Sequence, residues 1–207
     1  MTSAAPPHGT DRPPVSAIGI GCSAGGLDVL HHILPNLPAG LSVPVVVVAH
    51  MGPSPDNPIL EALKRHCHLP VVEAEERRKV AAGIIHVCPP DYHLLVEADH
   101  TFALSADGKI NNSRPSIDAF LDSAADCWGN GLLAVLLTGA SIDGARGMAA
   151  VKAAGGTCVV QDPATAFAPV MPQAAIDAGA ADWIMPPDRI AELITSLCLP
   201  NRRGASA

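Results

Sequence analysis

Short apolar segments recur along the chain, separated by longer segments in which apolar and polar residues alternate at helical spacing. The apolar segments cover residues 16–21, 43–49, 132–137 and 157–161. Short runs that are apolar throughout and rich in β-branched residues are typical of strands covered on both faces, as in a parallel sheet. We therefore expect these segments to form a mostly parallel sheet.

The intervening segments have the periodicity of amphipathic helices. In residues 116–128, for example, Ile117, Phe120, Leu121 and Ala124 fall on one helical face. Strands that alternate with helices are typical of an α/β fold, and we expect a doubly wound sheet with helices on both faces. The other predicted helices cover residues 27–34, 57–66, 144–154 and 187–197.

One stretch departs from this alternation. Short strand-like pieces at residues 84–88, 93–97 and 101–104 are separated by polar or proline-containing breaks, which favours a short antiparallel hairpin inserted into or beside the main sheet. We expect a single domain over residues 15–198. The segments 1–14 and 199–207 are predicted to be disordered tails.

Composition excludes several classes of function. The formal net charge is −7 and aromatic residues make up 3% of the chain, so neither the basic face of a duplex binder nor the aromatic platforms of a single-strand binder are available. No segment resembles a secretory signal or is long enough to span a membrane. We expect a cytoplasmic protein that neither binds nucleic acid nor inserts into a membrane.

The six cysteines are scattered and form no C-x-x-C pair, so we interpret them as small hydrophobic residues. The only metal-like cluster is His66-Cys67-His68. Adjacent residues do not share a helix face, which disfavours a metal site there. We expect no metal and no cofactor.

The most informative segment is Gly-Ile-Gly-Cys-Ser-Ala-Gly-Gly at residues 19–26, which follows the first predicted strand and opens a helix. It matches both G-x-G-x-x-A, a dinucleotide-binding pattern, and G-x-S-x-G, a turn that exposes Ser23 as a nucleophile. The dinucleotide pattern requires an acidic residue at the end of the second strand. That strand ends in Ala49-His50-Met51 instead, which disfavours nucleotide binding.

A nucleophilic serine requires a base and a group that orients the base. His50 ends one neighbouring strand, and Asp143 follows the strand at residues 132–137 in a glycine-rich loop. The order of an α/β-hydrolase is excluded because all nine histidines precede Asp143. Each residue also has a structural interpretation: Ser23 as a helix N-cap, His50 as a hydrogen-bonded strand-end residue, and Asp143 as the cap of the helix at residues 144–154.

Taken together, these elements resemble the catalytic domain of chemotaxis protein-glutamate methylesterases of the CheB type, from about Val15 to Ile194. The resemblance rests on six elements in order: residues 21–26, 49–51, 83–94, 114–118, 137–145, and 161–165 with 171–175. It implies hydrolysis of glutamyl methyl esters on the cytoplasmic helices of methylated chemoreceptors, with release of methanol, and also deamidation of certain glutamines. A separate phosphorelay or receiver protein is a further implied partner.

The resemblance also assigns roles to residues. Ser23 is the implied nucleophile, His50 the base and Asp143 the orienting acid. The backbone N–H of Ala140 is the implied oxyanion donor, with that of Ala24 as a second candidate. Met171 and Arg114 are the implied substrate-binding residues. For Arg114 a second role is equally open, that of capping the loop before Ser116.

Several residues depart from the family pattern. Ala24 stands where threonine is usual, Ala140 where methionine is usual and Val170 where glycine is usual, and residues 52–57 differ as well. These changes affect the substrate cleft more than the proton path. They leave an alternative open, a catalytically idle relative that acts as a binding module in a signalling complex. No receiver domain precedes the matched region, so we expect a form free of control by an attached receiver, either constitutive or regulated by a separate partner.

Overall fold

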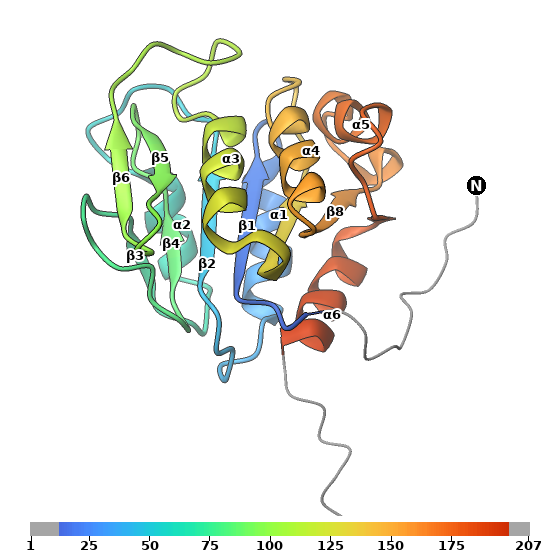
Figure 1. The fold of residues 1–207 in the computed structure, drawn as a ribbon, viewed down its shortest axis with the longest axis horizontal. Coiled ribbons are helices and arrows are strands. Elements are labelled where there is room, and N and C mark those ends of the chain that lie inside the picture. Colours follow the sequence, from blue (N-terminus) through green and yellow to red (C-terminus); the bar gives the residue numbers. More distant parts are fainter. Residues whose placement is uncertain (1–12, 199–207) are drawn as a thin grey trace, which may run out of the picture.

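A computed structural model describes residues 13–198 as a central sheet with helices on both faces (Figure 1). The seven strands lie in the order β3-β4-β2-β1-β7-β8-β9, and every neighbouring pair is parallel. Their bounds are β1 Ala17–Cys22, β2 Val45–Ala49, β3 Val71–Glu73, β4 Ile85–Val87, β7 Leu132–Leu136, β8 Thr157–Gln161 and β9 Trp183–Met185. The prediction of a doubly wound, mostly parallel α/β fold is confirmed.

The helices divide between the two faces of the sheet. Helices α1 (Gly26–Ile33), α2 (Pro58–Lys64) and α6 (Pro187–Cys198) pack on one face, and α3 (Ile117–Trp128), α4 (Ala145–Ala153) and α5 (Val170–Asp177) on the other. In Figure 1, α3 and α4 lie in front of the sheet and α1 and α2 lie behind it. Short 3-10 turns cover Leu34–Asn36, Gly129–Gly131 and Pro163–Thr165.

The predicted antiparallel hairpin is present, but only two of the three segments expected in it form it. Strands β5 (His93–Val96) and β6 (Phe102–Ser105) pair antiparallel as a separate two-stranded sheet that packs beside α3. Residues 85–87, however, join the main sheet as β4, parallel to both β2 and β3. Strands β3 and β9 were not predicted, because three-residue segments carry little periodicity, and helix α5 was not predicted either.

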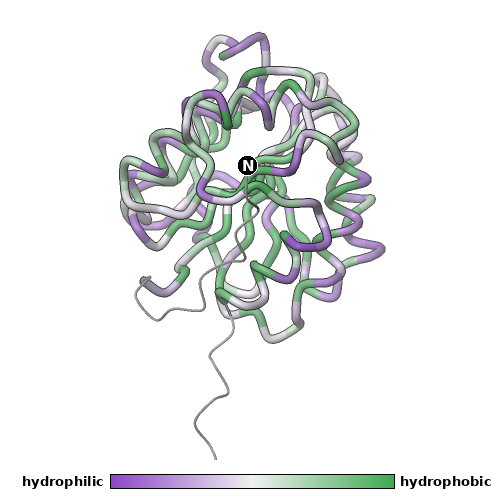
Figure 2. Tube along the Cα trace, turned by 90° about the vertical axis from the view of Figure 1, so that its right-hand side faces the viewer, coloured by the Kyte–Doolittle hydropathy of each residue, from purple (hydrophilic) through white to green (hydrophobic). Residues whose placement is uncertain are grey.

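The central strands are buried on both faces, which explains their unbroken apolar sequence. Figure 2 shows hydrophobic segments at the centre of the molecule and hydrophilic turns toward the outside. In β1, Ile18 and Ile20 face α1 and α6, whereas Gly19 and Gly21 face α3. A Cβ at Gly21 would lie 2.5 Å from Cγ2 of Ile117, so glycine is required here for the close packing of α3 on the strand.

The chain topology determines where a site can form. Strand order reverses at β1, and the loops after β1, β2 and β7 all leave the carboxyl edge of the sheet side by side. Such an edge is where open α/β sheets bind ligands. No helix among the described residues is long and apolar enough to cross a membrane. Apart from residues 13 and 14, the predicted tails lie outside the described residues.

Candidate active site

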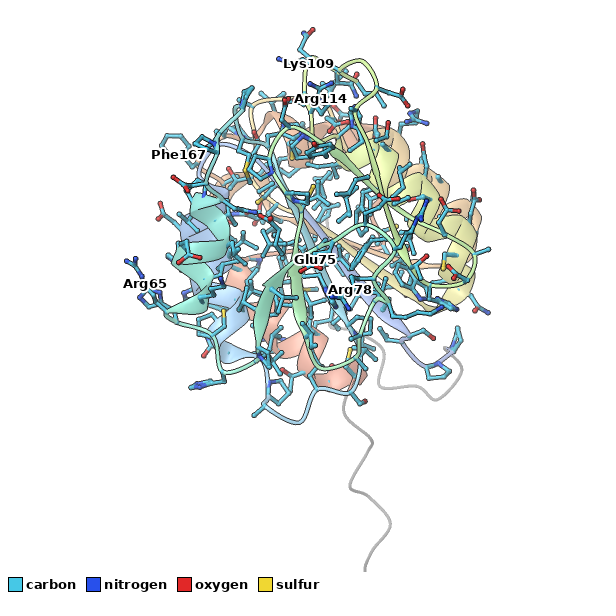
Figure 3. The ribbon with its side chains drawn as sticks, turned by 90° about the vertical axis from the view of Figure 1, so that its left-hand side faces the viewer. Arg65, Glu75, Arg78, Lys109, Arg114 and Phe167 are labelled. Atoms are coloured by element: carbon cyan, nitrogen blue, oxygen red, sulfur yellow. The ribbon has the colours of Figure 1, made fainter. Side chains whose placement is uncertain are left out.

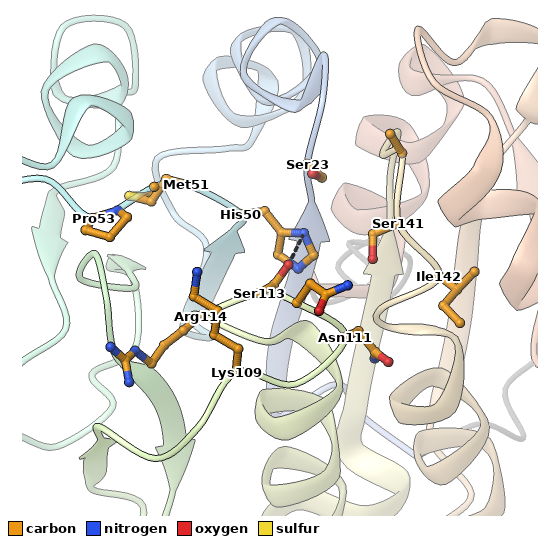
Figure 4. A pocket seen from close by; sticks show the side chains of 13 residues that line it. Ser23, His50, Met51, Pro53, Lys109, Asn111, Ser113, Arg114, Ser141 and Ile142 are labelled. Carbon is orange, nitrogen blue, oxygen red and sulfur yellow. Dashed lines mark hydrogen bonds between the residues drawn. The ribbon is translucent and has the colours of Figure 1, made fainter.

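The carboxyl edge of the sheet holds an open cavity of about 710 Å³ (Figure 4). Ser23 follows β1, His50 follows β2, and both side chains line this cavity. Asp143 lies behind His50 in the loop between β7 and α4 and is fully buried. The three residues that the sequence singled out are therefore brought to one place by three adjacent loops.

The His50 and Asp143 side chains are directly paired. His50 Nε2 lies 2.7 Å from Asp143 Oδ2, and the His50 side chain is only 10% exposed. Burial by itself raises the pKa of Asp143, but hydrogen bonds from His50, Asn111, Ile117 N–H and Ser116 outweigh it and hold the pKa at about 2. Asp143 is thus a carboxylate, and the His50 nitrogen that faces it carries the proton.

Asp143 does not cap its own helix. The N-cap of α4 is Gly144, whereas Asp143 accepts hydrogen bonds from the N–H groups of Ile117 (2.6 Å) and Asp118 (3.3 Å) in the first turn of α3. The sequence interpretation that Asp143 caps the helix at residues 144–154 was therefore wrong. Asp143 accepts hydrogen bonds from the start of α3 instead. A partial positive charge at a helix N-terminus favours a carboxylate, so α3 helps to keep Asp143 ionised.

Ser23 lies in a tight turn between β1 and α1. Its N–H donates to Thr138 O at 2.9 Å, and its carbonyl accepts from Gly26 N–H at 2.8 Å. The N-cap of α1 is Gly25, with φ of 77° and no side-chain cap, so Ser23 is not the N-cap that the structural interpretation required. Within residues 13–198 the Ser23 hydroxyl has no hydrogen-bond partner, and it faces the cavity.

Two backbone donors lie beside Ser23. Ala140 follows β7 and lines the cavity, and Ala24 is the residue after Ser23. Among the described residues, neither N–H has a hydrogen-bond acceptor. The preceding residue, Gly139, is fixed by hydrogen bonds of its N–H to Ala168 and of its carbonyl from Met171. The peptide that ends at Ala140 therefore carries an available donor on a fixed backbone.

Arg114 lines the cavity, but its hydrogen-bond donors are already engaged. The guanidinium pairs with Asp91 at 2.8 Å and donates to the carbonyls of Ala106 and Asp107 at 2.8 and 2.9 Å. Of the two roles considered for Arg114, these contacts favour anchoring the loop that connects β6 to α3. Met171 is fully buried against Gly139 and does not line the cavity, so it supports the Ala140 loop from below.

Sequence reasoning missed Asn111 and Ser113, which line the cavity from the β6–α3 loop. Asn111 donates to Asp143 Oδ1 at 3.0 Å, and Ser113 Oγ lies 3.2 Å from His50 Nδ1. Ser116 also reaches Asp143, at 2.9 Å, while capping α3. The Asn111-Asn112 pair was the available signal, because asparagine tolerates the positive φ of tight turns. Nothing in the sequence placed that turn beside His50.

No group of three or more histidine, cysteine or acidic side chains in the part of the chain that the structure describes is arranged to hold a metal ion. Four of the six cysteines are buried, and Cys67 and Cys127 are partly exposed. Burial raises the pKa of Cys22, directly before Ser23, to about 12, so this thiol stays protonated beside the site.

The fold is a doubly wound parallel α/β sheet. Its carboxyl edge holds a serine, a histidine–carboxylate pair and backbone N–H groups without acceptors among the described residues. These are the groups that a serine hydrolase requires. Residues 18–194 match the family model described as CheB methylesterase. The chain belongs to the CheB methylesterase family. The resemblance stated from the sequence is thus confirmed, and the dinucleotide-binding interpretation is not supported.

Individual relatives agree with this assignment. A Leptospira interrogans protein is 42% identical over 181 residues, which are 87% of this chain and 94% of that protein. The protein-glutamate methylesterase/protein-glutamine glutaminase of Symbiobacterium thermophilum is 38% identical over 89% of this chain and 51% of its own length. The crystal structure of the Thermotoga maritima CheB methylesterase catalytic domain matches with a TM-score of 0.85 and 37% identity, over 88% of this chain and 98% of that one.

Proposed function

We propose that Ser23, His50 and Asp143 form the catalytic triad of a protein-glutamate methylesterase that acts on methylated chemoreceptors in the cytoplasm. Membership of the family supports the reaction class, since relatives carry the name protein-glutamate methylesterase/protein-glutamine glutaminase. The observation that carries the assignment of residues is the 2.7 Å contact between His50 and the ionised Asp143 in the cavity that Ser23 lines.

The reaction follows from which His50 nitrogen is free. Asp143 holds Nε2–H, so Nδ1 is the basic nitrogen that accepts the Ser23 proton. Ser23 Oγ attacks the ester carbonyl carbon, and the oxyanion that forms accepts hydrogen bonds from the N–H groups of Ala140 and Ala24. Collapse of this intermediate breaks the C–O bond to the methoxy group, which takes the proton from Nδ1 and leaves as methanol.

Water then completes the cycle. It gives a proton to Nδ1 and attacks the acyl-serine carbonyl. The second oxyanion then collapses with cleavage of the bond to Ser23 Oγ, which takes the proton back from Nδ1, and the glutamic acid product ionises to glutamate by releasing its proton to solvent. A primary amide in place of the ester follows the same course with ammonia as the leaving group, which accounts for glutaminase activity at the same site. Regulation by a separate receiver or phosphorelay protein stays a prediction.

The direct test is methanol release from methylated chemoreceptor cytoplasmic fragments. We expect release by the wild type and its loss in Ser23→Ala, with activity retained in Ser196→Ala, a matched substitution on α6 whose hydroxyl bonds Leu193 O. Equal release by wild type and Ser23→Ala would contradict the assignment of the nucleophile. No release from any receptor fragment would contradict the substrate and favour the idle binding module.

A further inference from the structure

The loop between β6 and α3 contains a tight two-residue turn beside the triad. Ile110 and Ser113 exchange backbone hydrogen bonds of 3.1 and 2.9 Å, and the two residues between them have positive φ, 49° at Asn111 and 62° at Asn112. Positive φ at both central positions is the mark of a type I′ turn, for which asparagine is one of the suited residues. The turn therefore holds Asn111 and Ser113 in fixed directions.

The turn contacts both the acid and the base. Asn111 Nδ2 donates to Asp143 Oδ1 and to Asp118 Oδ2, each at 3.0 Å. Ser113 Oγ lies 3.2 Å from His50 Nδ1, a contact that Figure 4 marks with a dashed line, whereas the other ring nitrogen, Nε2, is the one paired with Asp143. One short turn thus reaches both members of the His50–Asp143 pair.

The direction of the Ser113 hydrogen bond follows from the charge on Asp143. An ionised carboxylate only accepts, so His50 Nε2 carries the proton and the Nδ1 of a neutral ring is a bare lone pair. Ser113 must then be the donor and Nδ1 the acceptor. Nδ1 is also the nitrogen that has to receive the Ser23 proton, so two hydroxyl groups compete for a single lone pair.

We propose that Ser113 is a positioning residue that occupies the Nδ1 lone pair of His50 in the resting enzyme and must release it before His50 can deprotonate Ser23. This inference rests on the proposed function for its consequence in catalysis, and on the hydrogen-bond geometry of residues 110–113 for the contact itself. The absence of a hydrogen-bond partner for the Ser23 hydroxyl among the described residues agrees with it.

Ser113 can donate to Nδ1 only in the neutral ring, because a protonated Nδ1 donates instead and the hydroxyl then turns to accept. Removing the hydroxyl in Ser113→Ala should therefore free the Nδ1 lone pair of the neutral ring, and the nitrogen signal of Nδ1 at high pH should change. The charged groups around the ring are Asp143, Asp118 behind Asn111, and Lys109 and Arg114 across the cavity. All of them stay in place in Ser113→Ala, so the difference between the variants isolates the hydroxyl.

The first experiment is a nitrogen-15 NMR titration of the His50 ring in the full chain. At high pH, where the ring is neutral, we expect the Nδ1 signal to move toward that of a free lone pair in Ser113→Ala, to recover toward wild type in Ser113→Thr, which retains a hydroxyl, and not to change in Ser196→Ala. An unchanged Nδ1 signal of the neutral ring in Ser113→Ala would overturn the inference. This readout needs no turnover, so it is independent of whether the enzyme demethylates receptors.

The second experiment follows labelling by a small fluorophosphonate, with the modified residue identified by mass spectrometry. Ser23 Oγ forms a bond to phosphorus as the P–F bond breaks, and the serine proton passes to Nδ1. We expect Ser23 to be labelled about 3- to 10-fold faster at high pH in Ser113→Ala, the range that loss of one neutral hydrogen bond provides. Slower labelling, or an adduct on Ser113, would overturn the inference, whereas no labelling in either protein alongside a changed Nδ1 signal would count against the proposed function alone.

Discussion

The side chains of Asp118 and Asp143 each accept hydrogen bonds from the N-terminal N–H groups of the helix that starts beside the other residue. Asp118, in the first turn of α3, accepts hydrogen bonds from Gly144 N–H (2.9 Å) and Gly147 N–H (2.7 Å) at the start of α4. Asp143, which precedes the N-cap residue Gly144 of α4, accepts from the N–H groups of Ile117 and Asp118 at the start of α3. The exchange fixes the two helices to each other, and it holds the carboxylate that orients His50.

This exchange predicts a stability effect for Asp118. Asp118→Ala removes the side-chain acceptor for two N–H groups of α4 and should lower the free energy of unfolding by about 1 to 2 kcal/mol. Burial raises the pKa of Asp118, so the neutral acceptor in Asp118→Asn should retain most of that stability. Urea denaturation measures both, with Asp122→Ala as a control, because Asp122 forms only a partly exposed ion pair with Arg146. An equal loss in the Ala and Asn variants would contradict the cap.

A second prediction concerns pH. The folded-state pKa of Asp143 is lowered from 3.8 to about 2, so its stabilising contribution is present above the unfolded value and is lost as pH falls through about 2. At 1.36 kcal/mol per pKa unit the contribution is about 2 kcal/mol. We expect the stability difference between wild type and Asp143→Asn to shrink by about this amount between pH 5 and pH 2, as measured by urea unfolding. If the unfolding free energies of wild type and Asp143→Asn changed with pH in parallel, Asp143 would not be held as a carboxylate in the folded protein.

A third prediction concerns Lys109, which lines the cavity mouth and extends outward above Arg114 (Figure 3). Lys109 makes no ion pair with any described residue, whereas the charge of Arg114 is paired with Asp91. Lys109 is therefore the cation available to an acidic side chain beside the ester. Lys109→Gln should raise the KM for methylated receptor several-fold at low salt with kcat little changed, and the difference should fade as salt rises.

The matched control for Lys109 is Lys64→Gln on α2, where the lysine pairs with Glu61. We expect that variant to match wild type in both constants. A fall in kcat with unchanged KM in Lys109→Gln would assign the residue to loop structure instead of substrate binding.

A fourth prediction tests the contact between β1 and α3. In Gly21→Ala the new methyl group would lie 2.5 Å from Ile117, so α3 must shift, at a cost of about 1 to 3 kcal/mol in unfolding free energy. Because Ile117 N–H bonds Asp143, fluorophosphonate labelling of Ser23 should slow as well. Gly40→Ala, at a position with no atom within 4 Å, should leave both unchanged. Wild-type stability in Gly21→Ala would show that α3 does not need this close approach.

Much of the fold could be predicted because its signals are local. The apolar run at residues 45–48 identifies a strand whichever neighbours it has, and the spacing of Ile117, Phe120 and Leu121 identifies a helix. Strand β4 was harder to place, since three residues cannot show whether they pair with a hairpin partner or with β2. Which strand β4 pairs with depends on how the rest of the protein packs around it.

The candidate triad was accessible from the sequence for a related reason. Parallel strands bring their carboxyl ends to one edge, so Ser23, His50 and Asp143 could be grouped without coordinates once their strands were identified. The sequence by itself thus determined the fold class and the family, and it grouped the three candidate residues that the structure brings together at the carboxyl edge. Only the tertiary structure decided that Asp143 caps α3, that Arg114 is engaged with Asp91, and that Ser113 faces His50 Nδ1. Those outcomes depend on the directions of side chains from distant segments, and each is set by packing and hydrogen bonds among loops that no local pattern encodes.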